Sequence, residues 1–183
     1  MNQLDGHFLI ADPRLTDSNF FRSVVLITRH TQQGATGLVV NQPSNIDLGE
    51  IWENLSDSPL GRNAPLYLGG PVEGPLSALH TVPELGEMKV LKNVFVSMNR
   101  RELDELLSGD HGRCRVFSGY SGWGPGQLEQ ELAVGGWMTV PATSQHLFAD
   151  PEPLYRTVCE ELGCDILFAG QPPDRLPADP SLN

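Results

Sequence analysis

The apolar residues of this chain fall in short runs that glycine- and proline-containing turns separate. Residues 23–30, SVVLITRH, form a continuous apolar run rich in β-branched side chains, which is typical of a strand buried on both faces. The run at residues 7–11, HFLIA, predicts a strand before it, and the run at residues 37–43, GLVVNQP, predicts one after it. Because the link TQQGAT is short, we expect the strands at 23–30 and 37–43 to pair antiparallel.

Further strands mix with short helices in the rest of the chain. The segments that predict strands are PLYLGGPV, SALHTV, EMKVLKNVFVS, RCRVF and WMTVPA. Asp47 and Glu50 form a predicted capping box for a helix that runs through Leu55, and Asn99 with Glu102 is expected to cap a second helix, RRELDELLS. Three more helical segments are expected: one begins at about Pro125, one ends at Phe148, and one runs from Pro151 to a stop at Gly163.

Neither a βαβ rhythm nor a clean run of hairpins dominates this order of elements. The pattern therefore predicts an α+β fold in which a mixed, largely antiparallel sheet is flanked by short helices. A chain of 183 residues fits one ordinary domain. We expect that domain over residues 1–170, where CDILFAG is the last apolar segment, and a proline-rich, acidic tail over residues 171–183.

The net negative charge of the chain disfavours one class of partner, nucleic acids. The chain has 12 Lys and Arg against 23 Asp and Glu, a formal net charge of −11, so direct nucleic-acid binding is not expected. The first apolar run is too short for a signal peptide, and no stretch is long enough to span a membrane. The chain has three cysteines, a small and odd number that argues against a secreted disulfide framework, and we interpret them as free thiols. These features predict a cytoplasmic protein without a membrane partner.

Residues 117–137, FSGYSGWGPGQLEQELAVGGW, are like three catalytic or binding loops but complete none of them. Trp123 occupies the place of the second glycine of a nucleophile elbow around Ser121. No lysine follows Gly126, as a phosphate loop requires, and Glu129 stands where a dinucleotide loop has its third glycine. We interpret the stretch as an aromatic-capped turn into a helix. In it, Trp123 and Trp137 pack in the core and donate to carbonyls, and Glu129 and Glu131 lie on a solvated face.

Three of the five histidines, His7, His30 and His80, flank predicted strands, where binding sites often gather. Their alternative role is to satisfy buried backbone groups or to lie at the surface. Asn41 places an amide at a strand end, where a turn role is equally natural. No pair of histidines has metal-ligand spacing, and we expect neither a metal site nor a cofactor.

Several of these segments occur together, in order, in one known family. HFLIADPRLTDSNFFRSVVLITRH, GATGLVVNQP, LGGPV, GYSGWGPGQLEQEL, GGWMTVPA, HLF and LGCDIL resemble the YqgE/AlgH family of bacterial proteins, from residue 7 to about residue 167. The resemblance implies a compact mixed fold with a smaller, sandwich-like subdomain from the middle of the chain. It implies no established catalytic residues, and its members carry the label of transcriptional regulators. The chain departs from the family pattern after Pro71 and in the tail.

The resemblance and the polar positions together suggest one binding surface. Its candidate residues are His30, Asn41, His80, Tyr120, Trp123, Gln127 and Glu129. The first hypothesis is a regulatory or binding protein, not an enzyme, with a protein or small-molecule partner. The alternatives are a hydrolase that uses Ser121 with a histidine, and a DNA-associated transcriptional regulator.

Overall fold

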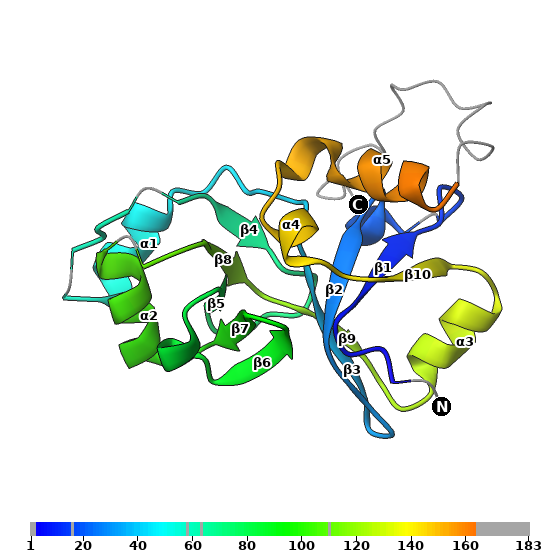
Figure 1. The fold of residues 1–183 in the computed structure, drawn as a ribbon, viewed down its shortest axis with the longest axis horizontal. Coiled ribbons are helices and arrows are strands. Elements are labelled where there is room, and N and C mark those ends of the chain that lie inside the picture. Colours follow the sequence, from blue (N-terminus) through cyan, green and yellow to red (C-terminus); the bar gives the residue numbers. More distant parts are fainter. Residues whose placement is uncertain (1–2, 16, 58, 63, 110, 164–183) are drawn as a thin grey trace.

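The structure is a computed structural model that describes residues 3–15, 17–57, 59–62, 64–109 and 111–163. Its strands form two five-stranded sheets that lie beside each other, with helices on their outer faces (Figure 1). The expected α+β class is confirmed, and the strands divide between two sheets instead of forming one. In the described part of the chain, no helix is both long and apolar enough to cross a membrane.

The first sheet, sheet A, is entirely antiparallel and has the strand order β10-β1-β2-β3-β9. The antiparallel pairing expected from the short TQQGAT link is confirmed. The central strand β2 is buried along most of its length, as its continuous apolar run predicts. The strands are β1 (His7–Ala11), β2 (Val24–Thr31), β3 (Gly34–Val39), β9 (Ser121–Trp123) and β10 (Trp137–Pro141).

The second sheet, sheet B, comes from the middle of the chain and has the order β4-β8-β5-β7-β6. Strands β4 and β8 are parallel, and the other neighbours are antiparallel. Sheet B corresponds to the smaller subdomain that the resemblance implies. Its strands are β4 (Leu66–Leu68), β5 (Ser77–His80), β6 (Met88–Leu91), β7 (Val94–Ser97) and β8 (Cys114–Ser118).

The alternation of side chains along sheet B divides the apolar residues between two clusters. On β8, Phe117 faces the core that sheet B shares with sheet A, whereas Val116 faces the opposite side. That opposite side is covered by α1 (Leu48–Leu55) and α2 (Arg100–Ser108), which bury Trp52 and four leucines against it. The sheet therefore has an apolar neighbour on each face.

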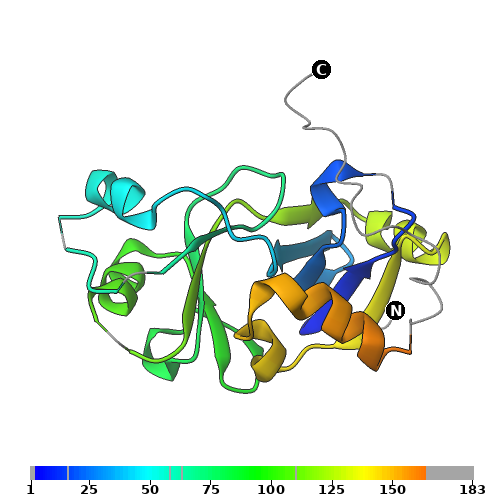
Figure 2. The ribbon, with the colours of Figure 1, turned by 90° about the horizontal axis from the view of Figure 1, so that it is seen from above.

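The remaining helices lie around sheet A. Figure 2 shows α5 (Pro151–Glu161) lying across sheet A, where the Tyr155 hydroxyl donates to the Ala11 carbonyl at 2.7 Å. Helix α3 (Gln127–Ala133) connects β9 to β10, and α4 (Ser144–Leu147) precedes α5. Two single 3-10 turns complete the described structure, η1 (Ser18–Phe20) and η2 (Pro83–Leu85).

Of the two predicted N-terminal helix caps, one forms in the structure and the other does not. Asp47 caps α1 as expected, because its carboxylate accepts the Gly49 N–H at 2.7 Å. The predicted cap by Asn99 is wrong, since its side chain makes no capping bond. Glu87 from the preceding hairpin accepts the Asn99 N–H instead, at 2.6 Å, so a tertiary contact replaces the local one. The expected tail and the apolar segment CDILFAG lie outside the described residues.

Candidate functional site

A pocket of about 230 Å³ opens in the seam between sheets A and B, and we call it the seam pocket. Most of its lining is apolar, and four hydroxyl-bearing side chains interrupt that lining. The apolar contributors are Leu38, Pro75, Met88, Val96 and Met98, and the hydroxyl-bearing ones are Thr28, Thr36, Ser77 and Tyr120. Within the described residues, no charged side chain lines it. Such a lining suits a neutral ligand with few polar groups.

Tyr120 is held at the seam pocket by backbone pairing and by neighbouring glycines. Tyr120 and Val72 each donate a backbone N–H to the other's carbonyl at 3.0 Å. A Cβ at Gly74 or Gly122 would stand 3.1 or 3.3 Å from the tyrosine ring, so these glycines leave room for it. The preceding residue, Gly119, has a φ of +70°, which non-glycine residues adopt rarely.

The two threonines of the seam pocket lie at an irregularity of the β2–β3 pairing. The register shifts between Ile27 and Arg29, which leaves Thr28 out of the ladder. The Thr28 hydroxyl compensates by donating to the Thr36 carbonyl at 3.1 Å, and the two hydroxyl oxygens lie 3.2 Å apart. The bulge therefore turns polar atoms toward a seam that is otherwise apolar.

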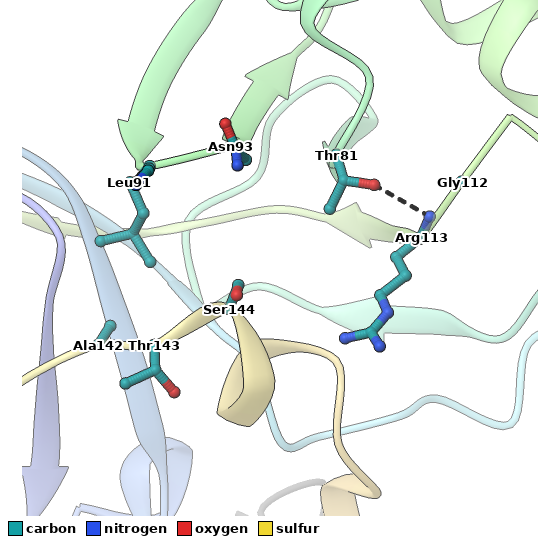
Figure 3. A pocket seen from close by; sticks show the side chains of 9 residues that line it. Thr81, Leu91, Asn93, Gly112, Arg113, Ala142, Thr143 and Ser144 are labelled. Carbon is teal, nitrogen blue, oxygen red and sulfur yellow. Dashed lines mark hydrogen bonds between the residues drawn. The ribbon is translucent and has the colours of Figure 1, made fainter.

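A second cavity, the loop cleft, has a volume of about 740 Å³ and lies where four connections meet. Figure 3 shows its side chains, which come from the end of β5, the β6–β7 turn, the segment before β8 and the β10–α4 link. Thr81 and Arg113 hold two of these connections together through a hydrogen bond from the Arg113 N–H to the Thr81 hydroxyl at 3.2 Å. The cleft is lined by Thr81, Leu91, Lys92, Asn93, Gly112, Arg113, Ala142, Thr143 and Ser144.

His80 is fully buried in sheet B and is part of an oriented chain of hydrogen bonds. Its Nδ1 accepts the Val82 N–H at 3.3 Å, so the proton is on Nε2, which donates to the Ser97 hydroxyl oxygen at 3.0 Å. The Ser97 hydroxyl in turn donates to the Leu85 carbonyl. His80 therefore cannot take a proton from Ser97 in this arrangement, and its role is to join β5, β7 and η2.

The buried His80 imidazole should make the free energy of unfolding depend on pH. Burial lowers the pKa of His80 below its ordinary value of 6.5, although the negative charge of Glu87 opposes this shift. The unfolded chain therefore binds a proton more readily, and the free energy of unfolding is expected to fall as the pH drops below about 6.5. One histidine contributes at most about 1.4 kcal/mol per pH unit.

Urea unfolding at pH 7.5 and at pH 5.5 measures this contribution. The variant His80→Gln should be less stable at pH 7.5 and lose less stability on acidification than the wild type. His111→Gln, at an exposed histidine, is the matched control and should keep the wild-type pH dependence. An unchanged slope in His80→Gln would contradict the assignment.

His30 and Glu129, two of the predicted site residues, do meet in the structure. His30 Nε2 lies 3.0 Å from Glu129 Oε1, and His30 Nδ1 accepts the Leu4 N–H at 3.3 Å. The backbone N–H of His30 donates to Asp5 Oδ1 at 3.0 Å. The backbone amide of Glu129 and the His30 side chain together lower the pKa of the Glu129 carboxyl. This contact fastens the N-terminal segment, β2 and α3 to one another.

Asn41 and the loop residues are also engaged in hydrogen bonds. Asn41 accepts the Val24 N–H at 2.8 Å and donates to the Arg22 carbonyl at 2.9 Å, which secures the start of β2. Gln127 accepts the Gly124 N–H at 3.0 Å and so closes the turn before α3. Among the predicted site residues, Tyr120 alone lines either of the two cavities described above.

Glu131 has a role that sequence reasoning missed. Its Oε2 accepts both the Trp123 and the Trp137 indole N–H groups, at 2.9 and 2.7 Å, and its Oε1 accepts from Gln127 at 2.9 Å. The expectation that the indoles donate to carbonyls and that Glu131 is solvated is therefore wrong. The i,i+4 spacing of Gln127 and Glu131 was the available signal, but the link to both tryptophans depends on tertiary packing.

Ser121 is buried within β9 and donates its hydroxyl to the Gly69 carbonyl at 3.1 Å. In the described ranges, none of the histidines hydrogen-bonds to it. Across the same residues, no three His, Cys, Asp or Glu side chains gather closely enough to hold a metal ion. Cys114 is a free thiol, and burial raises its pKa to about 11, which makes it a poor nucleophile.

Comparisons with known proteins agree over most of the chain. A family model described as AlgH-like matches residues 8–167. A UPF0301 protein of Myxococcus xanthus is 38% identical over 170 residues, which cover 90% of this chain and 94% of the relative. A UPF0301 protein of Streptomyces coelicolor is 36% identical over 192 residues, which cover 100% and 97%. The solution structure of the AlgH protein from Pseudomonas aeruginosa superposes with a TM-score of 0.75 at 32% identity, covering 95% of this chain and 97% of that one.

Proposed function

The chain belongs to the AlgH-like family, as its sequence segments indicated, and we propose that it is a regulatory binding protein whose seam pocket holds a small, neutral, mainly apolar ligand. The observation that carries this proposal is the lining of the pocket. Leu38, Met88, Val96 and Met98 surround a few hydroxyl groups, which is the usual composition of a small-molecule site. The regulator label that the resemblance supplies fits a protein that senses a ligand without converting it.

The mouth of the seam pocket carries apolar surface that the core does not use. Met98 is 48% exposed although it is a large apolar side chain, and it lines the pocket together with Tyr120. A thioether side chain adapts its shape to different apolar partners. A tyrosine ring adds a flat apolar face and one hydroxyl that donates or accepts. These two side chains are therefore the proposed ligand contacts at the entrance.

The other predicted site residues support the frame around the pocket in this proposal. His30, Asn41 and His80 use their polar atoms on partners within the fold. Trp123, Gln127 and Glu129 likewise fix the loop and helix that follow Tyr120. We therefore assign ligand contact to Tyr120 and positioning to the other six.

Several features favour binding over hydrolysis and over DNA recognition. The hydroxyls of Ser121 and Ser97 each donate to a backbone carbonyl, so neither is activated by a histidine in the geometry present. The formal net charge of −11 disfavours a phosphate backbone. The free thiol of Cys114 fits a reducing compartment, and we place the function in the cytoplasm.

Titration with N-phenyl-1-naphthylamine, a neutral fluorophore whose emission rises in apolar surroundings, tests the seam pocket. The wild type should bind one equivalent saturably. Tyr120→Ala should weaken binding about tenfold, because losing a packed ring contact costs on the order of 1–2 kcal/mol. Tyr120→Phe keeps the ring and should bind nearly as well as the wild type.

Val134→Ala is the control for a substitution outside the seam pocket, since Val134 is 84% exposed at the end of α3 and lines neither cavity. It should leave the titration unchanged. The seam-pocket function is wrong if the wild type shows no saturable binding, or if Tyr120→Ala and the wild type bind the probe equally.

A further inference from the structure

We propose that the loop cleft is a second, independent site, which binds a small phosphate-bearing molecule with an apolar body. Lys92 and Arg113 both line the cleft, and no carboxylate lines it among the residues that the structure describes. In that same part of the chain, neither cation makes an ion pair, whereas Arg14 pairs with Asp12 and Arg100 with Asp104. Two cations that line one cleft, without an ion pair to any described residue, form a local positive region on a chain whose acids outnumber its bases.

Two hydroxyl groups of the loop cleft are available as hydrogen-bond donors. The Thr81 oxygen accepts the Arg113 N–H at 3.2 Å, and the Thr143 oxygen accepts the His146 N–H at 3.2 Å. An oxygen that accepts from a backbone amide keeps its own hydrogen to donate. These two O–H groups, the Lys92 ammonium and the Arg113 guanidinium thus offer hydrogen bonds to an acceptor. A phosphate supplies several acceptor oxygens with negative charge, and an arginine fork binds it through two of them.

The backbone around Arg113 is shaped to keep the cleft open. Gly112 has a φ of +91°, and a Cβ there would stand 2.9 Å from the Thr81 hydroxyl oxygen. Both terminal nitrogens of Arg62 donate to the Gly112 carbonyl at 3.1 Å, which fixes this turn from outside the cleft. Figure 3 shows the Arg113 side chain extending from the Thr81 side of the cleft toward the side where α4 begins. The backbone that carries the guanidinium is thus held in a defined conformation.

The cleft also has an apolar part, which sets the class of ligand. Leu91 and Ala142 line it beside the polar groups. A volume of about 740 Å³ lies within the usual range of small-molecule sites and exceeds what an inorganic ion fills. The combination fits a phosphomonoester with a partly apolar body, such as a nucleoside monophosphate, and AMP is a suitable probe.

Isothermal titration with AMP and with adenosine, at low ionic strength, tests the site. The wild type should bind AMP at least tenfold more tightly than adenosine, because the phosphate provides the charged contacts. The double variant Lys92→Gln/Arg113→Gln should lose at least tenfold in AMP affinity. The double variant Lys89→Gln/Arg101→Gln removes the same charge from two exposed positions outside the cleft and should bind AMP like the wild type.

Three results would overturn the proposal. The first is no AMP binding by the wild type at millimolar concentration, and the second is equal binding of adenosine and AMP. The third is equal AMP affinity in the two double variants, which would mean that net charge alone governs binding. Tyr120→Ala separates the two sites, since it should leave AMP affinity unchanged, and a loss of AMP binding in that variant would place the nucleotide in the seam pocket instead.

Discussion

Replacing Arg115 with alanine should lower the free energy of unfolding by about 2–4 kcal/mol, because it removes hydrogen bonds from a charged group, which each contribute about 1.5–3 kcal/mol and are not additive. Arg115 is 7% exposed, and its guanidinium donates to the Val40 carbonyl at 2.9 Å and to the Ala149 carbonyl. It also lies 4.8 Å from the centre of the Tyr67 ring. One side chain thus joins the end of β3, sheet B and the segment before α5, and alanine would leave both carbonyls without this donor.

Urea unfolding of three variants, Arg115→Ala, Arg115→Lys and Arg113→Ala, tests whether the guanidinium contacts of Arg115 cause the loss of stability. Arg115→Lys keeps a positive charge but has no planar fork, so its loss of stability should be intermediate. Arg113→Ala, two residues earlier on an exposed position, should change the free energy of unfolding by no more than about 0.5 kcal/mol. A similar effect for Arg113→Ala and Arg115→Ala would contradict the bridging role.

Replacing Glu131 with alanine should cost about 2–4 kcal/mol of unfolding free energy, because hydrogen bonds to a charged group each contribute about 1.5–3 kcal/mol and are not additive. Glu131 accepts from Trp123 and Trp137, whose rings lie 6.0 Å apart edge to face. Phe20 packs on both rings, so the carboxylate fixes an aromatic cluster that joins the two edge strands of sheet A, β9 and β10. Tryptophan emission should shift to longer wavelength as the indoles gain access to water.

Glu129→Ala is the matched control on the same helix. Glu129 lies two residues away and contacts the buried His30 imidazole instead of the indoles, and one such hydrogen bond contributes about 0.5–1.5 kcal/mol. The tryptophan emission spectrum of the Glu129→Ala variant should stay at the wild-type position. At about 2–4 °C for each kcal/mol, thermal unfolding should also distinguish the two variants. Equal midpoints and equal spectra would show that the carboxylate of Glu131 does not hold the tryptophans.

The elements with a strong local pattern were predicted, and those that depend on a distant partner were not. The continuous apolar run at residues 23–30 predicted a strand, and the structure has β2 at Val24–Thr31. Strand β9 was not predicted, because Ser121–Trp123 has no strand pattern of its own and pairs with β3 through tertiary contact. The cap by Asn99 failed for the same reason, since Glu87 from another segment binds the backbone there.

The candidate sites could be predicted only in part. Tyr120 was chosen from a glycine-rich stretch and does line the seam pocket, whereas Thr28, Met88 and Met98 reach it from separate segments that carry no motif. Lys92 and Arg113 come from separate segments that carry no motif, and the meeting of four connections brings them to one cleft. Spacing along the chain cannot show such meetings when no helix or strand joins the residues.

The pairing of β1 with β10 joins two strands that lie far apart in the sequence. His7 lies opposite Pro141, and all of sheet B is encoded between these two strands. A ribosome therefore releases the first strands long before their last partner exists, and one edge of β1 stays open throughout that interval. Closing so long a stretch of chain costs loop-closure entropy, so we expect β10 to pair with β1 after the local strand pairs of sheet B have formed.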